Sequence, residues 1–466
     1  MRRLPGILLL TVATLIVIVA LLVSGLRLVL PQLDAWRPQL LEKISTLTGT
    51  PVDASQITAS WQTFGPTLDA RDIHVGLKDG GTMAVKRVTL ALDVWQSLLH
   101  MRWQFRDLTF WQLQVHTNTP IQTNDGGESL KTDRISDLFL RQFDHFTLRD
   151  SHLSFLTISG QRAELAVPQL TWLNGRNRHR AEGQLSLSSL TGQHGVMQVR
   201  MDLRDEDGLL NKGRVWLQAD DIDVKPWLGR WMQDNIALKS ARFSLEGWMT
   251  IEKGDVASGD VWLKKGGASW QGDNEVHHLS VDNLTAHLSH DKQSWAFYIP
   301  DTRIAIDDKP WPSGALAMAW IPAQDVGGDD RQRSDELRIR ASNLALSGLS
   351  GLQPFADKLA PSLGELWRTT QPGGKINLLA LDIPLQATEK TRFQAQWSDL
   401  AWKQWKLLPG AEHFSGSLNG SVEHGELRAH MAKALMPYAG VFRAPLEIAA
   451  GEATLSWVKN DKGFML

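Results

Sequence analysis

The sequence of 466 residues contains no cysteine. This absence excludes a disulfide framework, thiolate metal ligands, a cysteine nucleophile and a lipid anchor attached through cysteine. An excess of charge of one sign is also missing, because 49 basic residues stand against 51 acidic ones and the formal net charge is −2. Nucleic-acid binding requires clustered positive charge, so we do not expect it. Buried apolar surface and paired backbone groups must hold the chain together.

The sequence also lacks the short motifs of common enzymes, such as G-x-S-x-G, H-E-x-x-H, G-x-G-x-x-G and G-x-x-x-x-G-K-[ST]. A pair of carboxylates facing across a sugar cleft, as in glycosidases, is without support. Titratable residues are densest over residues 275–291, which include His277, His278, His287 and His290. Successive strand positions face opposite ways, so at most half of this group could share one metal ion. We expect no enzyme activity, no cofactor and no metal site.

One long hydrophobic run stands at the amino terminus. Gly6–Leu30 carries a single charged residue, and a helix of about 20 apolar residues is long enough to cross a bilayer core. Arg2 and Arg3 precede the run, and no equally dense basic cluster follows it. The positive-inside rule therefore predicts a cytoplasmic amino terminus. We expect residues 1–30 to be a membrane anchor and residues 31–466 to lie across the membrane.

A cleaved signal peptide is the competing interpretation of the same run, because a positively charged start fits both. Signal peptides have an apolar core of about 7–15 residues, which is followed by small residues at a cleavage site. Here Ser24 and Gly25 are followed by further hydrophobic residues through Leu30. The length of the run favours an uncleaved anchor.

Beyond the anchor, the spacing of apolar residues over Leu33–Leu47 predicts a short amphipathic helix that ends at Gly49. Most of the remaining chain follows a period of two, which is typical of strands with one apolar face. Three such stretches supply our candidates for the lining of an apolar groove: Val88, Leu90, Leu92, Met197, Val199, Met201, Phe243, Leu245 and Met249. The same alternation is equally consistent with an ordinary buried sheet face.

The sequence therefore predicts a mainly β fold, an elongated curled antiparallel sheet that forms an apolar groove, with an amino-terminal transmembrane helix. No linker rich in Pro, Gly or Ser divides the chain, so we expect one body over residues 31–466 rather than several domains. Short helices are few, and they are predicted at Trp95–Met101, Ile135–Phe143, Pro226–Met232 and Pro354–Trp367.

A loose repeat recurs along the chain. Each copy has Asp or Asn, then Leu or Ile, then any residue, and then usually an apolar one. We expect each copy to begin a strand. The copies start at Asp72, Asp107, Asp221, Asn283, Asn343 and Asp399, and their spacing is too irregular for a fixed-period solenoid.

Tryptophan is abundant, with 20 residues against 2 tyrosines. Because indole rings bury a large area and suit strands, most of them are expected in the core. A sharper hypothesis is that some line an apolar surface open to lipid.

Several stretches resemble the AsmA-like proteins of Gram-negative envelopes. They include Ile44–Val52, Ala59–Trp61, Gly65–Leu68 and Leu90–Met101, and the similarity runs through the entire chain. The resemblance implies an inner-membrane anchor and a periplasmic β-groove of the bridge-like lipid-transfer type. It further implies movement of membrane phospholipids toward the outer membrane and support of its permeability barrier. Family members are much longer, so this sequence is expected to be an amino-terminal portion.

A second hypothesis belongs to a different class. An assembly or scaffolding factor would pair an exposed edge strand with a strand of a client outer-membrane protein. Lipid bound to the apolar interior would favour transfer, whereas crosslinks between an unprotected edge and other envelope proteins would favour assembly. The sequence leaves the lipid species and the direction of transport open.

Overall fold

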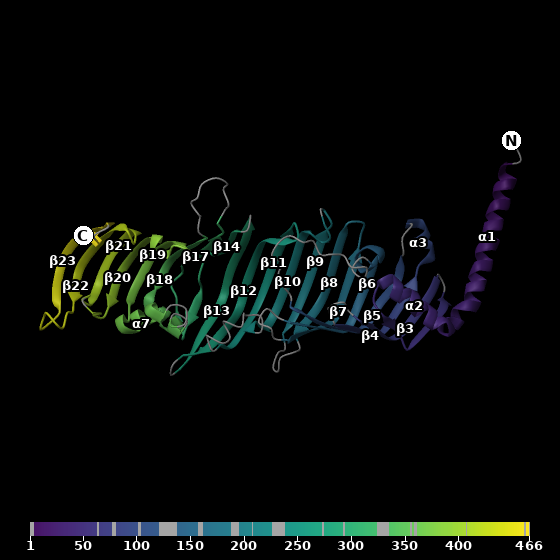
Figure 1. Ribbon diagram of the computed structural model, residues 1–466, viewed down its shortest axis with the longest axis horizontal. Coiled ribbons are helices and arrows are strands. Elements are labelled where there is room, and N and C mark those ends of the chain that lie inside the picture. Colours follow the sequence, from purple (N-terminus) through teal and green to yellow (C-terminus); the bar gives the residue numbers. More distant parts are fainter. Residues whose placement is uncertain are drawn as a thin grey trace. The chain divides into compact units, whose positions relative to one another are not determined.

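The computed structural model describes residues 4–465 except for residues 63–64, 77–80, 101–103, 121–137, 157–161, 188–194, 207, 226–237, 273–274, 292–293, 324–334, 355–356, 358–360, 407 and 461–462. The chain forms two compact units, Met1–Val215 and Trp216–Leu466, and in Figure 1 the strands of each unit lie side by side. The predicted fold class is confirmed: mainly β, with a curled, unclosed sheet, one apolar amino-terminal helix and few short helices.

Unit 1 begins with three helical segments and continues as strands. Its described elements are α1 (Leu4–Val29), η1 (Leu30–Trp36), α2 (Arg37–Thr48), β1 (Val52–Asp53), β2 (Gln56–Gln62), β3 (Gly65–Gly76), β4 (Thr82–Leu92), α3 (Val94–His100), β5 (Phe105–Pro120), η2 (Leu138–Gln142), β6 (His145–Leu156), β7 (Arg162–Asn174), β8 (Arg178–Leu187) and β9 (Val196–Arg204). The boundary between the units falls within β10 (Lys212–Asp223).

Unit 2 is also built mainly of strands. Its described elements after β10 are β11 (Leu238–Glu252), β12 (Asp255–Gln271), β13 (Val276–Asp291), β14 (Ser294–Ile299), β15 (Ile304–Ile306), β16 (Lys309–Pro310), β17 (Leu316–Ile321), β18 (Glu336–Ala345), η4 (Leu346–Leu352), α7 (Pro361–Thr370), β19 (Gly373–Pro384), η5 (Thr388–Lys390), β20 (Arg392–Trp402), β21 (Ala411–Ser421), β22 (His424–Met436), β23 (Leu446–Asn460) and β24 (Gly463–Met465).

The amino-terminal helix α1 has 26 residues. At 1.5 Å per residue it is about 39 Å long, which is enough to cross the hydrocarbon core of a bilayer. Its side chains at Ile16 and Leu21 are 62% and 68% exposed, as suits a helix surrounded by lipid. The chain continues through η1 into α2, which ends where Gly49 adopts φ 72° and donates its N–H to the Ser45 carbonyl. The predicted helix end at Gly49 is confirmed.

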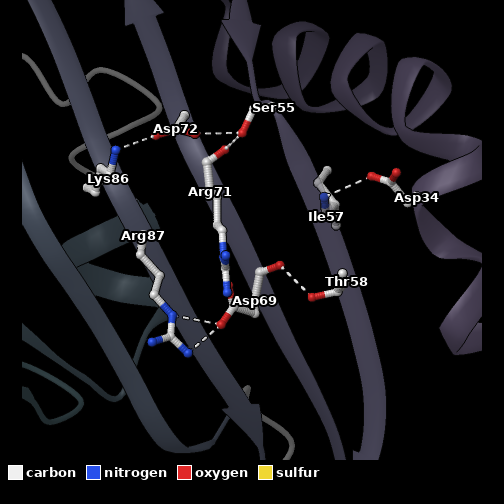
Figure 2. Close-up of polar contacts among 9 residues, drawn as sticks. All are labelled: Asp34, Ser55, Ile57, Thr58, Asp69, Arg71, Asp72, Lys86 and Arg87. Atoms are coloured by element: carbon white, nitrogen blue, oxygen red, sulfur yellow. Dashed lines mark hydrogen bonds and ion pairs between the residues drawn. The ribbon is translucent and has the colours of Figure 1, made fainter.

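The segment that follows α1 covers the first strands of unit 1. Leu33 and Leu41 pack against a small buried cluster that includes Ile57 and Ala70. Asp34 Oδ1 accepts a hydrogen bond, at 3.0 Å, from the backbone N–H of Ile57 on β2 (Figure 2). Unpaired N–H groups on an edge strand are a template for unwanted pairing. The segment after α1 thus supplies a hydrogen-bond acceptor for one N–H group of β2 and connects α1 to the sheet.

Neighbouring strands pair antiparallel, with one exception among the described pairings. β1 and β2 both pair with β3, and pairing within unit 1 then follows chain order up to β9. In unit 2, β13 pairs with both β14 and β15, and β14 pairs with β17. The exception is β5 and β6, which are parallel, with Thr109 opposite Thr147. Parallel neighbours require a long crossover connection, and residues 121–144 supply it here.

Two of the predicted short helices, α3 and η2, lie where the sequence placed them. The helix predicted over Pro354–Trp367 corresponds in part to α7, which ends at Thr370. Residues 226–232, where another helix was predicted, fall outside the described part of the chain.

The repeat marks bends inside strands, so our expectation that each copy begins a strand was wrong. Five of its six leading residues adopt left-handed backbone angles, with φ between 50° and 57°; they are Asp72, Asp221, Asn283, Asn343 and Asp399. Asp and Asn tolerate this conformation better than most side chains, because their short polar groups bond locally. The repeat therefore selects residues that let the strand turn.

Each bend shifts the alternation of side chains by one residue. On β13, Val281 and Leu284 both belong to one buried cluster, although three residues apart on a regular strand would place them on opposite faces. Asp282 and the left-handed Asn283 occupy the two positions between them and are exposed. In unit 1 such bends line up across neighbouring strands, because Asp72, Lys86 and Gln112 each lie between matching register pairs of β3, β4 and β5, and Asp72 and Gln112 both have positive φ. Rows of bends curl the sheet while keeping one face apolar.

Replacing Asn283 with isoleucine should lower the free energy of unfolding of unit 2 by about 1–2 kcal/mol, because a β-branched side chain clashes at positive φ. The matched variant, Asn283→Gly, removes the clash and should cost little. Urea unfolding followed by tryptophan fluorescence measures both. Equal stability of the isoleucine and glycine variants would mean that the bend does not constrain this position.

Candidate functional site

Cross-strand pairing assigns each strand residue to a face, because residues directly opposite each other on neighbouring strands point the same way. Within each unit, the buried hydrophobic clusters lie on one of the two faces of its strands. We call this the apolar face, and it comprises the residues of those clusters together with the strand residues in register with them.

In unit 1 the apolar face is covered and well buried from β4 to β7. Val85, Leu108 and Val167 are 3%, 2% and 1% exposed. Side chains from several strands pack against them, including the predicted Leu90 and Leu92. This part of the face therefore resembles an ordinary core.

In unit 2 part of the apolar face is open, beside the buried clusters around Trp270 and Val281. One register row crosses the unit from β11 to β23 and contains only apolar residues and glycine: Met249, Gly259, Leu288, Phe297, Met318, Ile339, Leu381, Phe393, Gly420, Gly425 and Trp457. Met249, Phe297 and Met318 are 38%, 37% and 41% exposed. Next to this row, Trp295 pairs with Trp320, and each is 37% exposed. Large apolar side chains left this accessible in a continuous row mark a binding surface.

Charge lies almost entirely on the other side of the sheet. Among described strand residues from β2 to β22, the one Asp, Glu, Lys or Arg that the register places on the apolar face is Lys309 of β16, which pairs with Ile306. The opposite face carries cross-strand ion pairs, such as Arg87 with Asp69 in unit 1 (Figure 2) and Lys264 with Glu246, at 3.0 Å, in unit 2. Hydrogen bonds from Lys264 and from the Trp216 indole lower the pKa of Glu246.

The nine predicted lining residues fall in three groups by exposure. Val88 and Met197 are buried, at 8% and 9% exposure, whereas Met249 is the most open of the nine and begins the row that crosses unit 2. The remaining six are half-buried on the same face of their strands: Leu90, Leu92, Val199, Met201, Phe243 and Leu245. The structure brings Val88, Leu90 and Leu92 into one cluster, and Phe243 packs against two clusters in unit 2. Their role as a lining stays a prediction.

The open residues of β14 and β17 were missed because their strands do not alternate. Each has six residues, and alanine occupies several positions on the opposite face, as in Trp295-Ala296-Phe297 and Ala317-Met318-Ala319. Without polar residues between the large ones, period two is invisible. Only the pairing of β14 and β17 with neighbouring strands shows which of their residues lie on the apolar face.

The titratable cluster of residues 275–291 is divided between the two faces. His277 lies on the apolar face, is 9% exposed, and has Nδ1 2.8 Å from Asp307 Oδ2. His290 stacks on Trp295, with ring centroids 4.1 Å apart. His287 lies on the charged face, where its Nδ1 is 2.6 Å from Asp260 Oδ1. Within the described residues, no group of three or more His, Asp or Glu side chains is placed to hold a metal ion.

Tryptophan occurs on both faces of unit 2. Trp295 and Trp320 lie on the apolar face, as the sharper hypothesis requires of some of them. Trp248 and Trp262 lie on the opposite face and are 51% and 44% exposed. Abundant tryptophan is therefore not in itself a marker of the apolar face.

Comparison with known proteins places the chain in a family. Residues 1–466 match the family model described as YhdP protein. The chain belongs to the YhdP family. A family member from Escherichia coli (strain K12), named intermembrane phospholipid transporter YhdP, is 74% identical over 466 residues. The alignment covers 100% of this chain and 37% of the relative, of which it is an amino-terminal part. No solved structure matches the chain.

Membership in the YhdP family confirms the resemblance seen in the sequence. The name of the E. coli relative describes transport of a lipid between membranes, not catalysis. In the described residues, the helix that is long and apolar enough to cross a membrane stands near the amino terminus. Both findings agree with the geometry of a sheet that has one apolar face with almost no charged residues.

Proposed function

We propose that this chain carries phospholipid between two membranes, with the acyl chains lying on the apolar face. The observation that supports this most strongly is the uncharged register row from Met249 to Trp457, whose large side chains remain partly exposed. The 74% identity to a relative named a phospholipid transporter supports the same substrate class. Because the chain spans 37% of that relative, we propose that it supplies a part of the lipid path.

The physical task of such a path is to keep lipid tails out of water. Each CH₂ group that leaves an apolar environment costs about 0.8 kcal/mol, so a tail of about 16 carbons would lose roughly 13 kcal/mol in water. An apolar face without gaps removes this cost at every step. A phospholipid headgroup remains hydrated and needs no pocket of its own. No catalytic group or cofactor is required in this mechanism.

We further propose that α1 anchors the chain in the inner membrane, that the amino terminus is cytoplasmic, and that residues 31–466 form a periplasmic body that holds the groove. Arg2 and Arg3 before an uncharged run support this orientation. Reporter fusions after residue 60 should be active in the periplasm and inactive in the cytoplasm, and the mature chain should keep its first residues. A soluble form that starts near residue 26 would instead show cleavage of a signal peptide.

Site-specific photocrosslinking in cells tests the substrate. A photoreactive residue at position 318, on the apolar face, should capture phospholipid, and the molecule can be identified by mass spectrometry. The matched control is position 317, the neighbouring residue on the opposite face of β17, which should capture none. Crosslinks from position 318 to an outer-membrane protein, without lipid, would favour the assembly hypothesis and contradict lipid carriage.

A further inference from the structure

Part of the crossover between β5 and β6 lies on the apolar face of unit 1. The ring centroid of Phe139, in η2, is 5.3 Å from that of Phe110 and 5.2 Å from that of Phe146. Phe143 follows, 5.5 Å from Phe139. These are distances of packed aromatic rings, so no acyl chain fits between them. We call residues 139–144 the aromatic cover.

One buried side chain holds this cover in place. Asn174, at the end of β7, is 8% exposed. Its Nδ2 donates hydrogen bonds to the carbonyl oxygens of Phe139, at 2.7 Å, and Phe143, at 2.9 Å. Its Oδ1 accepts a hydrogen bond from Trp172 Nε1 at 2.7 Å and lies 2.7 Å from His179 Nδ1. With both ends engaged, the amide has one orientation, and it links the cover to the sheet.

The backbone strengthens this attachment at one end of the cover. The N–H of Asn174 donates to the carbonyl oxygen of Asp144 at 2.7 Å. Asp144 Oδ1 in turn accepts a hydrogen bond from the N–H of Phe105 at 3.1 Å. The rings of Phe139 and Phe143 pack against the buried apolar cluster of unit 1. The aromatic cover is therefore attached through the backbone at Asp144. At Phe139 and Phe143 its backbone is attached through hydrogen bonds from the Asn174 amide.

Two kinds of force hold the cover, and a lipid tail could replace only one of them. An acyl chain on the apolar face would bury the same side chains that Phe139 and Phe143 now bury. It has no donor for the carbonyl oxygens that Asn174 satisfies. A lipid tail can thus compete with the two phenylalanine rings for the apolar surface. The hydrogen bonds of the Asn174 amide determine the free energy needed to displace the aromatic cover.

We propose that Phe139 and Phe143 occupy an acyl-chain binding site on the apolar face of unit 1, and that Asn174 is the latch that keeps the site closed until a lipid tail displaces the two rings. This inference rests on the proposed function. It adds that the apolar face of unit 1 is gated by the chain itself, whereas the row in unit 2 stands open.

The experiment uses the full 466-residue chain in membranes that contain phospholipid labelled with radioactive phosphate. A small diazirine amino acid is placed either at position 110, beneath Phe139, or at position 318 in unit 2, and the crosslinked fraction is measured. In the otherwise unchanged chain, position 318 should capture lipid and position 110 should capture little. In an Asn174→Ala background, capture at position 110 should rise by roughly tenfold to thirtyfold, the ratio expected when two hydrogen bonds are lost. Capture at position 318 should not change.

A second variant guards against misfolding of the first. Phe139→Ala with Phe143→Ala removes the rings but keeps Asn174, Trp172 and His179, and it should raise capture at position 110 as well. Strong capture at position 110 in the unchanged chain, or no rise in either folded variant while position 318 captures lipid, would overturn the latch. If position 318 captures no lipid in any background, the proposed function itself fails, and the latch fails with it.

Discussion

Replacing Met318 with aspartate should reduce phospholipid capture by the chain at least about tenfold, which corresponds to about 1.4 kcal/mol. Met318 lies in the middle of the row that crosses unit 2 and is 41% exposed. A carboxylate at this position keeps contact with water in the empty groove, so the sheet should still fold. An acyl chain passing over it would strip that water away, and an unpaired charge pays several kcal/mol for desolvation. Capture from a photoreactive residue at position 297, on the neighbouring strand, measures the effect.

The control for this variant lies one residue away. Ala317→Asp introduces the same charge on the opposite face of the same strand, and that face of unit 2 already carries ion pairs. It should leave capture at position 297 unchanged. Equal losses in the two variants would assign the effect to damage of β17 rather than to an interrupted path, and no loss in either would remove the apolar face from the lipid route.

Replacing Trp270 with alanine should destabilise unit 2 by about 3–5 kcal/mol, the usual cost of deleting a large buried aromatic side chain. Trp270 is 2% exposed and packs with Leu238, Ala241 and Ile306. Its Nε1 donates a hydrogen bond to the carbonyl oxygen of Gly351 at 2.9 Å, which ties η4 to the sheet. Urea unfolding monitored by circular dichroism gives the change in the free energy of unfolding.

The Trp270→Phe variant separates the two contributions of this side chain. It keeps most of the buried area, loses the hydrogen bond to Gly351, and should cost less than alanine. A loss below about 1 kcal/mol for the alanine variant would show that the segment η4 does not depend on this contact.

The alternation of residues was enough to predict strands and a one-sided apolar sheet, and the long apolar run was enough to predict the amino-terminal helix. The alternation was not enough to follow the apolar face along a strand. Val85 and Val88 share one cluster although they are three residues apart, because β4 shifts its alternation at Lys86 and Arg87. The Asp and Asn repeat carried the signal for such shifts. We assigned the repeat to strand starts because the pattern of apolar and polar residues does not reveal a left-handed backbone angle.

The cover of unit 1 shows another limit. A helix over Ile135–Phe143 was predicted, and η2 lies within it. Its position on the apolar face depends on the parallel pairing of β5 with β6 and on Asn174, which stands 31 residues after Phe143. No local pattern encodes contacts between such distant residues. The same reason applies to Phe297 and Met318, which are neighbours only through the register of β14 and β17.

A cryo-electron microscopy map of the chain in lipid nanodiscs tests the central claim most directly. We expect elongated density of acyl chains along the apolar face of unit 2, in contact with Phe297, Met318 and Trp320, and no such density on the face that carries Lys264 and Glu246. A protein layer or a second copy of the chain packed over the apolar row, with lipid found elsewhere, would contradict the account.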